Sequence, residues 1–132
     1  MHPGRILLSQ TQIGSRVRQL GQTLTRRYRG KNVLVLGVMN GALFFLADLL
    51  RSLELDDAQI ACVSLASYTG VQSTGLLRGL EICVLLAKRR KRDVPVRADW
   101  TGFTIDDEFV VGYGLDYNGR YRALKQIRLL EG

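Results

Sequence analysis

The sequence has 132 residues, a length that one domain with a single core accounts for. Its 46% hydrophobic and 23% charged residues exclude a disordered chain. No apolar run reaches the roughly 18 residues of a membrane span. The opening MHPGRILLSQ has too short an apolar block for a secretion signal, so we expect a cytoplasmic protein with no membrane partner. The net charge of +7 is compatible with phosphorylated small molecules, nucleic acid or simple solvation.

The first half of the chain predicts a helix, a strand and a second helix. Ser9 and Gln12 form a capping-box start, and apolar residues recur on one face over residues 9–28, which indicates a helix. The run NVLVLGV over residues 32–38 is typical of a strand buried on both faces. After a turn, ALFFLADLLRSL over residues 42–53 predicts a strongly apolar helix.

The second half predicts mainly strands. We expect them at residues 59–68, 82–88, within 96–105, 109–114 and 127–130. Buried strands interleaved with helices predict an α/β fold, a mainly parallel sheet flanked by helices, in one domain over residues 1–132. Cys62 and Cys83 lie in apolar runs, and we expect them to be buried free thiols. One His and two separated Cys do not have the spacing of a zinc site.

The carboxyl ends of the predicted strands carry polar, glycine-rich or charged residues. Ligands of open parallel sheets bind at these ends. We therefore expect the functional site among Met39-Asn40-Gly41, Ser67-Tyr68, Lys88-Arg89 and residues 113–122.

Four motifs resemble those of the hypoxanthine-guanine phosphoribosyltransferase family of purine salvage. They are VMNGALFFLADLL, SYTGVQSTG, VLLAKRRKRDVPV and FVVGYGLDYNGRYR, in consistent order over residues 6–130. The resemblance implies a type I phosphoribosyltransferase fold. It implies transfer of a phosphoribosyl group from phosphoribosyl pyrophosphate to hypoxanthine or guanine, which gives IMP or GMP and pyrophosphate. It also implies Mg²⁺ and a homo-oligomer.

Three of the matched residues belong to the purine side of the family's site. Phe109 matches the aromatic residue that stacks on the purine, and the backbone of Val110 matches the groups that read the purine's edge. Lys88 matches the lysine that reaches the exocyclic oxygen of a 6-oxopurine. Without the motif, Phe109 is typical of a strand core and Lys88 of a surface strand end.

Other matched residues belong to the phosphate side. Asp116 matches a carboxylate that holds Mg²⁺ through water, and Arg122 matches an arginine that neutralises the departing pyrophosphate. Met39-Asn40-Gly41 matches a pyrophosphate-binding loop with a cis peptide bond between its first two residues, and Asn40 stands where a lysine is common. Ser67 and Tyr68 match the start of a lid over the reacting groups.

One segment of the family's pattern has no match. STGLLRGLE runs directly into ICVLLAK, so we expect an internal gap near residues 80–83 of at least one central βα unit. In the family that segment holds the ribose acids, the 5-phosphate loop and the catalytic base, so no catalytic residue is assigned. Three explanations stay open: the sheet pairs differently, separate chains complement one another, or the natural protein has further residues here.

Two alternative functions follow from the same residues. If the chain is complete, it is a catalytically inactive module that binds a purine or a nucleotide. Alternatively, the basic run over residues 88–92 and the net charge serve nucleic-acid binding. Loss of an acid-rich segment explains part of the charge excess, so we do not expect a nucleic-acid partner.

Overall fold

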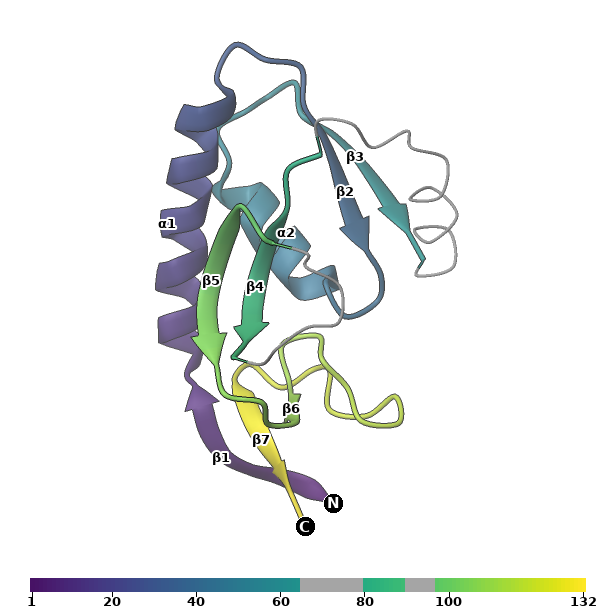
Figure 1. The fold of residues 1–132 in the computed structure, drawn as a ribbon. Helices are drawn as coiled ribbons and strands as arrows, with labels where there is room; N and C mark the ends of the chain where they lie inside the picture. The colour runs from purple at the N-terminus through teal and green to yellow at the C-terminus, as the bar shows by residue number, and fades with distance from the viewer. Residues whose placement is uncertain (65–79, 90–96) are drawn as a thin grey trace.

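The structure is a computed structural model that describes residues 1–64, 80–89 and 97–132. Its elements follow the chain in the order β1 (His2–Leu8), α1 (Gln10–Tyr28), β2 (Leu34–Val38), α2 (Leu43–Ser52), β3 (Gln59–Val63), β4 (Cys83–Lys88), β5 (Trp100–Ile105), β6 (Val110–Val111) and β7 (Ile127–Glu131) (Figure 1). No helix in these ranges is long and apolar enough to cross a membrane.

Helix α1 begins where the sequence predicts. The Ser9 side chain accepts a hydrogen bond from the Gln12 backbone N–H at 3.1 Å, and the Gln12 side chain accepts one from the Ser9 N–H at 2.8 Å. Arg16 on this helix donates to the backbone carbonyls of Thr101 and Gly102 in β5, at 2.9 and 2.8 Å. The helix therefore fixes the position of β5 through backbone groups as well as through its apolar face.

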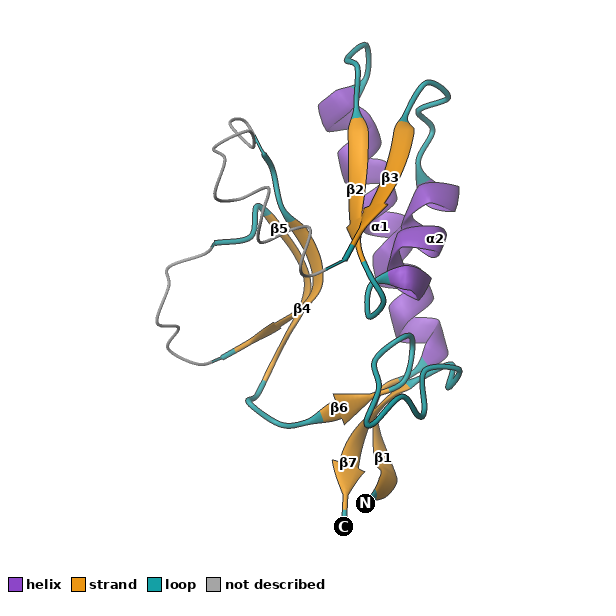
Figure 2. Cartoon of the chain, turned by 90° about the vertical axis from the view of Figure 1, so that its right-hand side faces the viewer, coloured by secondary structure: helices purple, strands orange, loops and turns teal. Residues whose placement is uncertain are grey.

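Four strands are parallel and form two separate pairs. Strand β2 pairs with β3, and β4 pairs with β5. Figures 1 and 2 show all four running in the same direction in the spatial order β5, β4, β2, β3, with both helices on one side. The predicted α/β class and the parallel strands are confirmed. Within the described ranges no strand lies between β4 and β2, as expected if a central unit is absent.

Several predicted burials are wrong. Residues 32–38 were predicted to be covered on both faces, yet Leu34 is 56% exposed and β2 has one fully buried residue, Gly37. Cys62 is exposed rather than buried, and Cys83 is intermediate. Each of these residues lies on a strand that has only one strand partner among the described residues, so neighbours that would cover it are not in place.

A three-stranded antiparallel sheet in the order β1-β7-β6 closes the molecule below the parallel strands (Figure 1). The terminal strand β7 was predicted, but β1 and its pairing were not. Strand β6 is only Val110–Val111, shorter than predicted, because the chain turns at the glycines that follow. This sheet supports the loop that carries most of the expected site.

Candidate functional site

The loop after β6 turns sharply because three successive residues have positive φ. Gly112, Tyr113 and Gly114 have φ values of 101°, 52° and 93°. A Cβ atom at Gly112 would lie 2.0 Å from the carbonyl oxygen of Gln126, so no larger residue fits there. The turn directs residues 115–122 back across the carboxyl side of the parallel strands.

Tyr113 anchors this loop to helix α2. Its ring is 7% exposed and packs edge-on against Phe44 with the ring centroids 6.0 Å apart. Its hydroxyl donates a hydrogen bond to the Asp48 carboxylate. Burial, together with the Asp48 carboxylate, raises the pKa of Tyr113 well above its usual range, so the hydroxyl stays protonated and keeps donating.

The loop after β2 lies against the same turn. A Cβ atom at Gly114 would approach the carbonyl oxygen of Gly41 to 2.8 Å. The Met39–Asn40 peptide bond is cis, as the family resemblance implies. The structure therefore brings the expected pyrophosphate loop next to the segment that carries Asp116 and Arg122.

Asp116 and Arg122 form one cluster. Arg122 Nη2 lies 3.2 Å from Asp116 Oδ1, and each side chain is about one third exposed, at 34% and 33% respectively. Arg122 Nη1 donates to the Gly114 carbonyl at 2.5 Å, and Asp116 Oδ2 accepts from the Gly119 N–H at 2.7 Å. Backbone contacts thus orient both side chains while leaving part of each open to a ligand.

Phe109 is not a core residue. Its side chain is 54% exposed, whereas the next residue, Val110, is 8% exposed and belongs to the core. The Phe109 ring meets Tyr117 at 5.9 Å between centroids with the planes at 90°. Tyr117 directly follows Asp116, so the exposed Phe109 ring packs against a residue that is the chain neighbour of the acid–guanidinium cluster.

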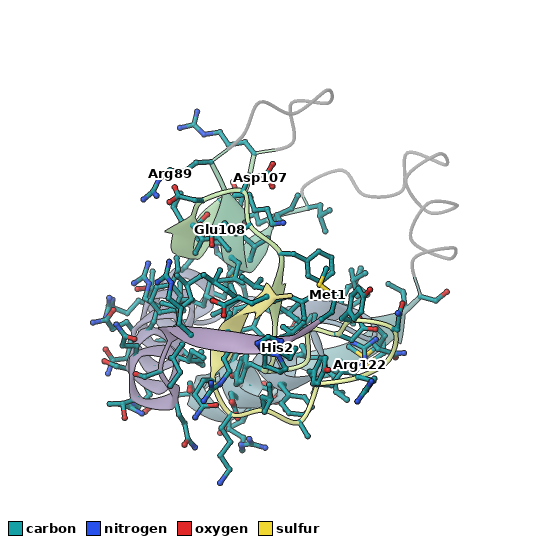
Figure 3. All side chains as sticks on the ribbon, turned by 90° about the horizontal axis from the view of Figure 1, so that it is seen from below. Met1, His2, Arg89, Asp107, Glu108 and Arg122 are labelled. Atoms are coloured by element: carbon teal, nitrogen blue, oxygen red, sulfur yellow. The ribbon has the colours of Figure 1, made fainter. Side chains whose placement is uncertain are left out.

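Lys88 ends β4 close to the start of the same segment. Its Nζ lies 3.6 Å from Asp107 Oδ1, two residues before Phe109. Arg89 pairs similarly with Asp106 at 2.8 Å. Figure 3 shows Asp107 and Arg89 near one another and Arg122 well separated from them, so the expected purine and phosphate residues occupy two ends of one region.

Sequence reasoning gave no role to three residues that organise this region. Tyr117 stands inside the motif FVVGYGLDYNGRYR, and Asp107 stands two residues before that motif begins. Their positions in or just before the motif were the signal that could have found them. Asp48 stands in another motif, and only the structure reveals that Tyr113 reaches it. The expected lid residues Ser67 and Tyr68 lie outside the described residues.

The donor set around Asp116 fits Mg²⁺ bound mainly by a substrate. No group of three or more His, Cys, Asp or Glu that could hold a metal occurs in the described parts of the chain. Mg²⁺ commonly takes one or two carboxylates, several waters and substrate phosphates. The single, partly exposed Asp116 carboxylate matches that requirement.

Comparison with known proteins supplies the family. No family model matches the sequence. The chain is 31% identical to the hypoxanthine phosphoribosyltransferase of Haemophilus influenzae, over 96% of this chain and 94% of that protein. The chain belongs to the hypoxanthine phosphoribosyltransferase family. It is also 30% identical to the bifunctional protein TilS/HprT of Listeria innocua over 96% of its own length, and it spans only 26% of that longer protein.

Solved structures of hypoxanthine phosphoribosyltransferases have the same fold. The Staphylococcus aureus enzyme superposes with a TM-score of 0.88 at 28% identity, over 98% of this chain and 93% of that one. The Trypanosoma cruzi enzyme in complex with the product IMP gives 0.83 at 26% identity, over 98% and 95%. These comparisons confirm the type I phosphoribosyltransferase fold that the resemblance implied.

The alignment with the Haemophilus influenzae hypoxanthine phosphoribosyltransferase also shows a difference in length. It runs over 170 positions, 38 more than this chain has residues. At least that many residues within the aligned part of the relative therefore have no counterpart here. This number exceeds the roughly 30 residues of a βαβ unit, and the position of the gap near residues 80–83 stays a prediction.

Proposed function

We propose that this chain forms the purine- and pyrophosphate-binding part of a purine-salvage site, at which hypoxanthine or guanine joins the ribose of phosphoribosyl pyrophosphate. The observation that carries the proposal is the exposed ring of Phe109, which packs against Tyr117, the residue next to Asp116 of the Asp116–Arg122 cluster. A flat aromatic surface beside a cation and a carboxylate suits a purine joined to a phosphorylated sugar.

Phe109 and Lys88 bind the purine in this proposal. The aromatic ring stacks on the base, an interaction that contributes about 1–3 kcal/mol per base. The Lys88 ammonium turns from Asp107, 3.6 Å away, to donate a hydrogen bond to the exocyclic oxygen of a 6-oxopurine. An adenine amino group offers no such acceptor, so the lysine selects hypoxanthine and guanine.

Arg122, Asp116 and the loop of Met39, Asn40 and Gly41 act on the pyrophosphate side. A purine nitrogen forms a bond to ribose C1′ and loses its proton while the bond from C1′ to the pyrophosphate oxygen breaks. By the family resemblance, the base that takes the proton lies among the residues that this chain lacks. Pyrophosphate leaves with the electron pair, and the Arg122 guanidinium stabilises its charge. Asp116 would help to hold Mg²⁺, which would supply further neutralisation of the phosphate charge.

A second candidate function is a purine-binding module without turnover. The observation that favours it is the minimum of 38 residues that the Haemophilus influenzae relative holds and this chain lacks. By the family resemblance, those residues hold the ribose 5-phosphate and the base that removes the purine's proton. Both candidates require a purine at Phe109, and they differ only in product formation.

Calorimetric titration with hypoxanthine tests the shared requirement. Phe109→Ala should weaken hypoxanthine binding by roughly 5- to 150-fold, the equivalent of about 1–3 kcal/mol. The matched control is Leu43→Ala, another exposed apolar residue at 48%, on α2. Leu43→Ala should leave hypoxanthine affinity within twofold. Equal affinity of wild type and Phe109→Ala would exclude a purine site at this ring.

A further inference from the structure

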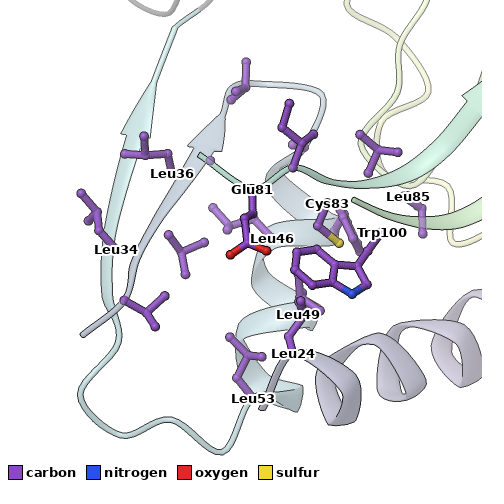
Figure 4. A pocket seen from close by; sticks show the side chains of 18 of the residues that line it. Leu24, Leu34, Leu36, Leu46, Leu49, Leu53, Glu81, Cys83, Leu85 and Trp100 are labelled. Carbon is purple, nitrogen blue, oxygen red and sulfur yellow. The ribbon is translucent and has the colours of Figure 1, made fainter. Parts of the chain in front are cut away.

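A hollow between β2 and β4 lies apart from Lys88 and Phe109 of the purine side. This cavity has a volume of about 760 Å³, and Figure 4 shows Leu34 and Leu36 of β2 on one wall, Cys83 and Leu85 of the β4 side on the other, and Leu46 and Leu49 of α2 between them. Lys88, Phe109, Asp116 and Arg122 do not line it. Gly41, Tyr113 and Leu115 do line it, so the cavity borders the loops after β2 and β6 but contains neither the purine-side residues nor the Asp116–Arg122 pair.

The walls of this cavity are two strand edges that have no strand partner in the described part of the chain. Strand β2 pairs only with β3, and β4 pairs only with β5, so each leaves its other edge facing the cavity. The four strands run in one direction, with β4 and β2 as inner neighbours (Figure 1). One further strand between them would complete a continuous five-stranded sheet.

The composition of the walls also suits a strand rather than a polar ligand. The lining side chains are mostly leucine, valine and aromatic residues. Glu81 is already paired with Arg27 at 3.0 Å, and Lys31 is the other charged lining residue among those described. A central strand of a parallel sheet is covered on both faces and is correspondingly apolar. Leu34 at 56% exposure and Leu80 at 40% show that this cover is incomplete.

The length difference from the Haemophilus influenzae relative is large enough for such a strand. The Haemophilus influenzae relative holds at least 38 residues within the aligned region that this chain lacks. Strands β2 and β4 have five and six residues, so an inserted strand of that length and its connecting helix are well within those 38. An apolar extended segment can add to an exposed sheet edge through main-chain hydrogen bonds.

We propose that the cavity between β2 and β4 is a docking site for one apolar β-strand from a separate polypeptide, the counterpart of the strand that this chain lacks. The strand enters parallel to both neighbours and pairs with both edges at once. Its side chains cover Leu34, Leu36 and Leu85. This inference concerns assembly of the sheet and does not require the purine site to be correct.

The test uses the complete chain and a synthetic peptide with the sequence of the Haemophilus influenzae residues that have no counterpart here. Calorimetry should show one-to-one binding, and the melting temperature should rise with peptide concentration. A peptide of the same composition in scrambled order should do neither. Absence of binding at millimolar peptide, or equal binding of both peptides, would overturn the proposal.

Matched variants locate the bound peptide. Leu34→Lys places a charge on the cavity wall and should weaken peptide binding at least tenfold. Ile60→Lys changes an equally exposed aliphatic residue, 53%, on β3 away from the cavity, and should leave binding within twofold. Circular dichroism verifies that both variants fold. Equal losses in the two variants would refute docking at the cavity.

Two further measurements separate this inference from other outcomes. Size-exclusion chromatography of the chain, run without and with the peptide, tests whether a second copy of the chain fills the cavity. We expect no dimer that the peptide dissociates. Such a dimer would mean that a second copy is the occupant, and it would overturn the proposal. Hypoxanthine calorimetry on the same protein reports on the purine site. If the chain binds the peptide but does not bind hypoxanthine, the proposed function is wrong and the docking proposal stands.

Discussion

The surroundings of Cys83 change the acidity of its thiol. It lies on the wall of the cavity between β2 and β4, and burial raises the pKa of the Cys83 thiol to about 11, against a smaller opposing effect of Arg16. Cys62, on β3, is exposed. The two thiols of the chain are thus distinguishable by reactivity, although the sequence placed both in apolar runs.

Iodoacetamide at pH 8 should therefore alkylate Cys62 at least tenfold faster than Cys83, because a raised pKa lowers the thiolate fraction of Cys83. Peptide mass spectrometry over time gives both rates in one sample. Addition of the docking peptide should slow Cys83 further and leave Cys62 unchanged. Comparable rates for the two thiols in the free chain would mean that Cys83 is not covered as described.

The raised pKa of Cys83 also makes the stability of the fold depend on pH. The folded-state pKa of Cys83 exceeds its ordinary value of 9.0, so its contribution to stability is complete below about pH 9 and is lost as the pH rises through 11. Tyr28 also contributes stability that is lost at high pH, because burial, and then Glu81, raise its pKa to about 12. Alkaline destabilisation should accordingly begin near pH 9.

The exposure of Phe109 was predictable from a motif, whereas the burial of residues outside such motifs was not. Phe109 would be assigned to a strand core by its neighbours alone, and only the motif indicated an exposed ring, which the structure has. Leu34 and Cys62 were assigned to the interior because their runs are apolar. Their exposure depends on which strands are beside them, and no local pattern contains that information.

At the scale of elements, helix α1 is the part most fully determined by local sequence. The reciprocal Ser9–Gln12 hydrogen bonds satisfy backbone N–H groups that the first turn would otherwise leave open. The periodic residues Ile13, Val17 and Leu20 are each 2% exposed. The capping residues and the periodic apolar residues indicate the same helix start, which is why the predicted start lies within one residue of the observed one.

Ser9→Ala should lower the free energy of unfolding by about 1 kcal/mol, since it removes the acceptor for the Gln12 N–H. Urea titration followed by circular dichroism measures the change. Ser15→Ala, in the exposed middle of the same helix, is the control and should stay within about 0.5 kcal/mol of wild type. An equal loss in both variants would show that the cap does not determine the helix start.

The antiparallel sheet could not be read from the sequence in the same way. Strand β1 pairs with β7, and the partners His2 and Glu131 stand at opposite ends of the chain. The hydrophobic pattern of HPGRILL carries no information about a partner strand at the other end of the chain. Strand β6 is short because Gly112 and the residues after it take positive φ, which a run of apolar letters does not predict.

At the scale of the whole molecule, the parallel strands are divided into two pairs and the purine and phosphate groups lie around the loop after β6. The phosphoribosyl side of the site, by family resemblance, belongs to the residues that the chain lacks. Its single-domain organisation over residues 1–132 and its assembly into a homo-oligomer stay predictions.

The chain alone should form no IMP from hypoxanthine, phosphoribosyl pyrophosphate and Mg²⁺, because the family's catalytic base lies in the absent segment. Ultraviolet absorbance or chromatography of the products measures this directly, with the Haemophilus influenzae enzyme as positive control. Turnover by the 132 residues alone at a rate near that of the control would refute the assignment of the catalytic base to that segment.

A crystal structure of the chain with hypoxanthine, pyrophosphate and Mg²⁺ is the most direct measurement of where the purine binds. We expect the purine ring stacked on Phe109 with its exocyclic oxygen toward Lys88, and the pyrophosphate beside Asp116 and Arg122. Density for the purine inside the cavity between β2 and β4, with the Phe109 ring bare, would contradict the account.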